Sequence, residues 1–195
     1  MAIATQDIQW LREETGVGMM DAKKALDETG GDKMKAVEVL RKRGAKVAAA
    51  KAERQVKDGF VGSYVHSNGK VAALVAVACE TDFVSRTEDF QALAHDLAVH
   101  VAAMNPKYLS PDMVPAEIIA KEEEIYREQL KAEGKPEAML EKILPGKLAK
   151  FYSDVCLLQQ PYVKDDKMTI AQVLETAISK LGENIQIANF SRISI

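Results

Sequence analysis

The feature that most constrains this fold is the run of nine apolar residues Val71–Cys79, which leads directly into Glu80-Thr81-Asp82-Phe83-Val84. Odd and even positions of the run are both apolar, which predicts a strand covered on both faces. Acidic residues then end the strand, and Phe83 follows at the start of a predicted loop. The sequence therefore indicates a rigid strand that presents the residues immediately after it.

A hairpin is predicted on the N-terminal side of this strand. Residues 59–66 alternate as a strand does, and Asn68-Gly69 predicts a two-residue type I′ turn, because that turn needs positive φ at both positions. A further strand is expected over Ile185–Ile193. We therefore predict a small antiparallel sheet built around Val71–Cys79.

One face of this sheet has an obvious cover. Apolar residues recur at helical spacing from Arg86 to about Met104, and Ser85-x-x-Glu88 reads as a capping box that starts this helix just after Val84. The second face has no such cover within the chain. A second copy of the chain, forming a homodimer, is the expected cover.

The first fifty residues predict three short helices. Thr5 is a plausible N-cap for the first, and Met19 to about Glu28 forms the second, which stops at Gly30-Gly31. Asp32 can cap the third, whose apolar stripe comprises Met34, Val37 and Leu40. The spacing predicts a compact three-helix bundle within residues 1–54.

A basic connector follows this bundle, from Arg41 to Lys57. It holds seven basic residues against the single acid Glu53: Arg41, Lys42, Arg43, Lys46, Lys51, Arg54 and Lys57. Such a run could bind RNA or the ribosome. A solvated, partly helical linker is the favoured reading, because no aromatic residues are interleaved to stack on bases.

The rest of the chain, residues 55–195, predicts an α+β core with a helical hairpin at about 116–150. A charged helix, Ala116 to about Glu133, is followed by a turn, and Pro145 is expected to kink or break the returning helix. Thr169 is predicted to cap a last helix that ends at Gly182. The fold class is therefore α+β.

Composition excludes several function classes. The net charge of −3 gives no general case for nucleic acid binding, and no apolar run approaches the ~20 residues that span a bilayer. Met1–Trp10 lacks the features of a signal peptide, so a cytoplasmic protein is expected. Cys79 and Cys156 lie far apart without metal-ligand spacing, and no phosphate-binding loop or nucleophile–base set appears. We expect a protein that is not an enzyme and that binds no metal, cofactor or nucleotide.

Phe83 has two readings. In the simpler one, Phe83 is a loop residue packed under the following helix, and Asp82 bonds its own backbone. A hydrophobic staple does not support that packing, because Val84 would pair with Asp89, which is not apolar. An exposed Phe83 between acidic residues is therefore more plausible than in an arbitrary chain.

Several motifs resemble the bacterial elongation factor Ts family, in its short form, over essentially the whole chain. They are Leu11-Arg12-Glu13-Glu14-Thr15-Gly16-Val17-Gly18-Met19-Met20-Asp21-Ala22-Lys23-Lys24-Ala25-Leu26, then Thr81-Asp82-Phe83-Val84, Gln160-Pro161-Tyr162-Val163 and Lys180-Leu181-Gly182-Glu183-Asn184-Ile185. The resemblance implies a guanine nucleotide exchange factor that binds elongation factor Tu, promotes GDP release and makes or breaks no bond. It also implies that the N-terminal bundle is similar to ubiquitin-associated domains.

The resemblance also implies roles for individual residues. Leu11, Arg12, Met19, Met20 and Asp21 would dock on the G domain of the partner, and His66 would make a further contact. Packing in the core is the competing reading for Met19 and Met20, since adjacent helical residues cannot both face inward. Thr81, Asp82, Phe83 and Val84 would act near the partner's magnesium and phosphates, with Asp82 and Phe83 as the wedge.

Overall fold

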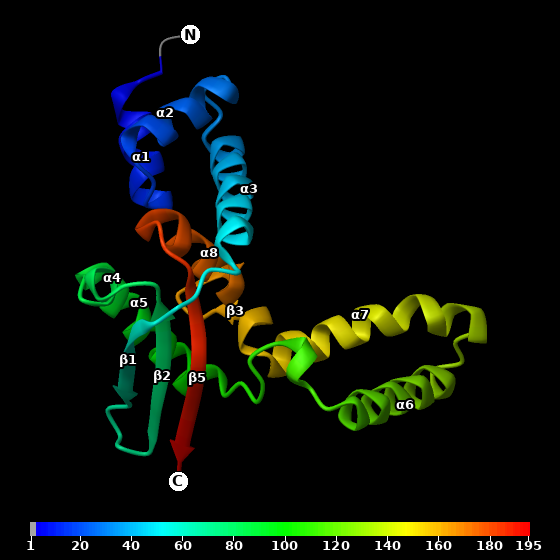
Figure 1. Ribbon diagram of the computed structural model, residues 1–195. Helices are drawn as coiled ribbons and strands as arrows, with labels where there is room; N and C mark the ends of the chain where they lie inside the picture. The colour runs from blue at the N-terminus through cyan, green and yellow to red at the C-terminus, as the bar shows by residue number, and fades with distance from the viewer. Residues whose placement is uncertain (1–2) are drawn as a thin grey trace.

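A computed structural model describes residues 3–195 (Figure 1). Residues 1 and 2, the start of the predicted N-terminal unit, lie outside the described residues. The elements in chain order are α1 (Thr5–Thr15), α2 (Met19–Glu28), α3 (Lys33–Lys51), β1 (Asp58–Val65), β2 (Val71–Cys79), α4 (Asp82–Ser85), α5 (Glu88–Met104), η1 (Pro111–Met113), α6 (Ala116–Ala132), α7 (Glu137–Val155), η2 (Leu157–Gln159), β3 (Pro161–Tyr162), β4 (Asp165–Thr169), α8 (Ile170–Leu181) and β5 (Ile185–Ser194). The predicted α+β class is confirmed.

Helices α1, α2 and α3 pack around one apolar cluster that includes Leu11, Leu26 and Leu40. Asp32 caps α3 as predicted, because its side chain accepts a hydrogen bond from the backbone N–H of Lys35. Two details of the prediction are wrong. Ala4, not Thr5, is the N-cap of α1, and no side-chain hydrogen bond caps this end of the helix. Met34 is 72% exposed, because the inner face of α3 is taken by Ala36, Val37 and Leu40.

Helix α3 continues through most of the basic connector. It ends at Lys51, and its second half packs on α8, where Gly44 lies close to the backbone of Glu175. Ala48 belongs to the apolar cluster of the sheet. One helix therefore joins the N-terminal bundle to the rest of the molecule (Figure 1).

The main sheet has the order β1-β2-β5, and both pairings are antiparallel. The odd residues of β2 face α5, so that Val75 and Val77 are buried with Phe90 and Leu97. Gly62 of β1 allows this close packing, because a Cβ there would lie 2.0 Å from the carbonyl oxygen of Ala94. The opposite face of the sheet is open in the described chain: Leu74 is 51% exposed.

The β1–β2 hairpin forms, but its predicted two-residue type I′ turn is wrong. Strand β1 ends at Val65 and β2 begins at Val71, and among the described turn residues Gly69 has a positive φ whereas Asn68 does not. Asn68 instead accepts a hydrogen bond from the N–H of Lys70 through its side chain. That local bond favours a longer loop.

Helices α6 and α7 form the predicted hairpin, which extends sideways from the sheet (Figure 1). The prediction that Pro145 breaks α7 is wrong, since the helix is continuous from Glu137 to Val155. Pro145 lies on the exposed side, while Leu140 and Leu144 are buried on the inner side. Packing against α6 therefore outweighs the loss of one helical hydrogen bond. Within residues 3–195, no helix is long and apolar enough to cross a membrane.

Candidate functional site

The Thr81–Val84 segment lies at the end of β2. Thr81 is the N-cap of α4, a single helical turn that carries Asp82, Phe83 and Val84. The predicted loop and the predicted Ser85 capping box are therefore wrong. Ser85 ends α4, and Thr87 caps α5 by accepting a hydrogen bond from the N–H of Phe90.

The side chains of the Thr81–Val84 segment point to different surroundings. Phe83 is 83% exposed, whereas Val84 packs against the core of the sheet. Asp82 pairs with Arg86 one turn later, with 2.9 Å between Oδ2 and Nη2. The segment thus exposes one large aromatic ring beside a carboxylate, while Val84 attaches it to the core of the sheet.

The C-terminal end of α4 is attached to β1. Ser85 is buried, and its Oγ donates a hydrogen bond to Oδ1 of Asp58 over 2.7 Å. This bond, together with one from the N–H of Gly59, holds the pKa of Asp58 below its ordinary value. Sequence reasoning missed the hydrogen bond between Ser85 and Asp58, because nothing in their spacing indicates a contact across 27 residues.

The predicted docking residues of the N-terminal bundle divide into two groups. Arg12, Asp21, Met19 and Met20 are exposed, the two methionines by 54% and 64%. The inner face of α2 is taken by Ala22, Ala25 and Leu26, so neither methionine packs in the core. Leu11 is completely buried, and its side chain can support this surface but not contribute to it.

His66 is exposed in the loop after β1, where its Nδ1 lies 2.9 Å from the hydroxyl of Tyr64. This loop and the Thr81–Val84 segment are at opposite ends of the sheet, since Asp58 pairs with Cys79 and Val65 with Ala72. A strand of 8 residues separates the two ends by roughly 25 Å. The candidate residues therefore lie on the N-terminal helices and at both ends of the sheet, a spread that fits a broad protein partner better than a small molecule.

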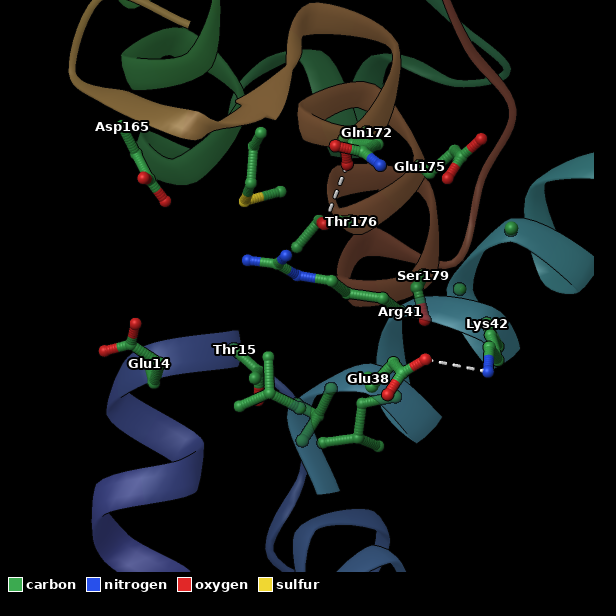
Figure 2. A pocket seen from close by; sticks show the side chains of 16 residues that line it. Glu14, Thr15, Glu38, Arg41, Lys42, Asp165, Gln172, Glu175, Thr176 and Ser179 are labelled. Carbon is green, nitrogen blue, oxygen red and sulfur yellow. Dashed lines mark hydrogen bonds and ion pairs between the residues drawn. The ribbon is translucent and has the colours of Figure 1, made fainter. Parts of the chain in front are cut away.

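A cavity of about 380 Å³ lies between the N-terminal helices and α8. Figure 2 shows Arg41 extending into it from α3, between the side of Glu14 and Thr15 and the side that carries Thr176. None of the predicted site residues lines it. Its polar residues form no arrangement of nucleophile, base and acid among those drawn in Figure 2.

Cysteines and histidines support the structure elsewhere. Cys79 and Cys156 are buried free thiols, and burial raises the pKa of both. His100 is buried beside Gln160, and burial lowers its pKa. Among residues 3–195, no cluster of three or more histidine, cysteine or acidic side chains could hold a metal ion.

Comparison with known proteins decides the family. A family model described as Elongation factor TS matches residues 15–195. The chain is 52% identical over 195 residues to an elongation factor Ts of Fervidobacterium nodosum, covering 100% of this chain and 99% of that protein. It is 51% identical over 195 residues to one of Maridesulfovibrio salexigens, covering 100% and 95%. The chain belongs to the elongation factor Ts family.

A further member of the elongation factor Ts family, from an Anaeromyxobacter species, is 54% identical over 185 residues, which cover 95% of this chain and 84% of that protein. The resemblance found in the sequence motifs is thereby confirmed, and the chain is a translation elongation factor. The match includes the Thr81–Val84 segment and Met19, Met20 and Asp21, while Leu11 and Arg12 precede residue 15.

Proposed function

We propose that this member of the elongation factor Ts family binds elongation factor Tu in its GDP form and accelerates release of GDP. In this proposal, Asp82 and Phe83 act as the wedge and disturb the magnesium and phosphate region of the partner, so that GTP can rebind. The observation that carries the proposal is the 83% exposure of Phe83 on a short helical turn whose far end is fixed to β1. An exposed aromatic on a fixed support can be buried by a partner at little entropic cost.

The N-terminal bundle would provide the second contact. Met19, Met20, Arg12 and Asp21 form an exposed surface with apolar and charged groups, as protein interfaces combine them. Leu11 supports that surface from the core. His66 would make a third contact from the hairpin loop.

More than one contact is needed on energetic grounds. A tenfold gain in release rate requires about 1.4 kcal/mol of differential stabilisation, and burial of one Phe supplies at most about 1.5–3 kcal/mol. Burial of Phe83 alone would therefore account for a roughly 10- to 100-fold increase in the rate of GDP release. Linkage adds a constraint: the factor by which this protein weakens GDP binding is the factor by which GDP weakens binding of this protein.

The open face of the sheet would bind a second copy of the chain. Register places Val61, Val65, Leu74 and Ile193 on this face, and each is more than half exposed. The polar residues that share the face, read from the described strands, are uncharged: Ser63, Gln186, Asn189 and Ser191. A neutral face can pack against itself without like-charge repulsion, as in two sheets packed face to face.

RNA binding through the basic segment at 41–57 is the weaker alternative. Several of its charges already have partners within the chain: Lys42 with Glu38, Arg43 with Glu28, Arg54 with Glu80, and Lys51 with the carbonyl oxygen of Gly182. RNA binding would fall steeply with salt and would be lost on neutralising Arg41 and Lys46.

The exchange proposal is tested by release of a fluorescent GDP from elongation factor Tu. Substoichiometric amounts of this protein should accelerate release, and excess GDP should weaken its binding to the partner. Unchanged release over a wide concentration range would contradict the proposal.

A further inference from the structure

Glu183 binds the start of the Thr81–Val84 segment and the residue before it, Glu80. Glu183 follows Gly182, the C-cap of α8, and lies 103 positions after Glu80 in the sequence. Its Oε2 accepts hydrogen bonds from the backbone N–H groups of Glu80 and Thr81, each over 3.0 Å. Its Oε1 accepts a third bond, from the hydroxyl of Thr81, over 2.6 Å.

A second set of bonds connects the same two segments in the opposite direction. The backbone N–H of Asn184 donates to Oε1 of Glu80 over 2.7 Å. The buried side chain of Asn184 donates to the carbonyl oxygen of Arg54 over 2.8 Å, and Arg54 also pairs with Glu80. The end of α8 and the end of β2 are therefore joined by reciprocal bonds, several of which involve a carboxylate and are strong for that reason.

These bonds matter because α4 is too short to fix its own orientation. An isolated turn of four residues is unstable, since helix nucleation is unfavourable. A threonine N-cap usually bonds the backbone of its own helix, but Thr81 makes no such bond and donates its hydroxyl to Glu183 instead. The bond from Thr81 to Glu183, at the end of α8, therefore fixes the direction in which α4 starts.

We propose that Glu183 is a positioning residue for exchange: it fixes Thr81 so that Phe83 is held against the partner instead of turning away from it. This role rests on the exchange function proposed above. Glu183 acts through Phe83, so its loss should lower the maximal rate of GDP release and leave the half-saturating concentration, which reflects docking by the whole surface, nearly unchanged.

The test measures fluorescent GDP release from elongation factor Tu as a function of the concentration of each variant. Glu183→Ala should lower the maximal rate roughly tenfold, because every bond from Glu183 to Glu80 and Thr81 is lost. Glu183→Gln should stay close to wild type. Its Oε1 can accept both backbone N–H bonds while its Nε2 donates to the Thr81 hydroxyl, which can also accept.

A double-mutant cycle separates positioning from a general structural effect. In a Phe83→Ala background, Glu183→Ala should have almost no further effect, because the side chain that it positions is gone. If Glu183→Ala does not fold, Thr81→Val replaces it in the cycle, since it removes only the hydroxyl bond, and roughly a threefold loss is expected.

A maximal rate unchanged by Glu183→Ala, or an equal loss with and without Phe83, would overturn the positioning role. Failure of the wild-type protein to accelerate release is a different result, because it would overturn the exchange function itself and this role with it.

Discussion

The Oγ of Ser85 lies 2.7 Å from Oδ1 of Asp58, and this bond attaches the far end of α4 to the first strand. The turn that carries Phe83 is therefore held at its beginning by Glu183 and at its end by Asp58. A fixed turn loses little conformational freedom when it presses against a partner. The rigid presentation inferred from Val71–Cys79 thus has two attachments outside that strand.

Ser85→Ala should slow exchange without unfolding the protein. It removes the hydrogen bond that Ser85 donates to Asp58, and the carboxylate of Asp58 stays solvated because it is exposed. We expect a several-fold lower maximal rate of GDP release. Ser67→Ala, in the exposed hairpin loop, is the control and should match wild type. Equal rates for both variants would show that the attachment to β1 is unimportant.

Leu74→Glu should weaken a dimer formed through the open face. The change would place a carboxylate in the centre of each neutral face, so that two carboxylates would be desolvated close to each other. The dimer dissociation constant, measured by light scattering over a dilution series, should rise at least about tenfold. Met113→Glu, at a residue 57% exposed away from this sheet, should leave it unchanged. A wild-type protein that is monomeric at all concentrations would contradict the dimer.

His100 should make stability depend on pH. The N–H of Val163 donates to its Nδ1, so its Nε2 carries the proton and donates to Oε1 of Gln160. Burial lowers the pKa of His100 in the folded state, so the unfolded chain takes up a proton more readily. The contribution of His100 is complete above its unfolded pKa of about 6.5 and is lost as the pH falls below that value.

The measurement is the urea midpoint of unfolding at pH 7.5 and at lower pH values, at about half-unit steps. His100→Gln should reduce the loss of stability on acidification, although it also lowers stability at neutral pH. His95→Gln, at an exposed histidine on the same helix, is the matched control. A pH profile for His100→Gln that parallels the wild-type profile would contradict the assignment.

Gly62→Ala should destabilise the sheet. Its Cβ would overlap the carbonyl group of Ala94 in α5, which is backbone and cannot rotate away. A loss of about 1–3 kcal/mol or more in the free energy of unfolding is expected. Gly146→Ala, where a Cβ meets nothing within 4 Å inside α7, should instead gain about 0.5–1 kcal/mol. Thermal unfolding of both variants distinguishes the close approach from the general effect of replacing glycine.

Local patterns predicted much of this fold. Val71–Cys79 is a strand, Asp32 and Thr169 cap helices, and Gly182 ends α8 with a φ of 79°. In each case a residue type and its near neighbours decide the structure. The sequence also favoured an exposed Phe83, because a hydrophobic staple at a Ser85 cap would have paired Val84 with Asp89, which is not apolar; Phe83 is exposed, but that cap does not form.

Predictions failed where a distant contact decided the local structure. Ser85 was predicted as a cap, but its hydroxyl donates to Asp58, and the short helix α4 begins earlier, at Asp82. Pro145 stays within a helix because buried Leu140 and Leu144 pack beside it. Glu183 was visible in a motif, but no spacing rule joins it to Thr81.

The proposed exchange function depends most directly on the side chain of Phe83. The most direct measurement compares the maximal rate of fluorescent GDP release from elongation factor Tu for wild type, Phe83→Ala and Met113→Ala, which removes another exposed apolar side chain. Phe83→Ala should lower the maximal rate roughly 10- to 100-fold, because burial of one Phe is worth about 1.5–3 kcal/mol. Met113→Ala should match wild type. A Phe83→Ala rate equal to that of wild type would contradict the account.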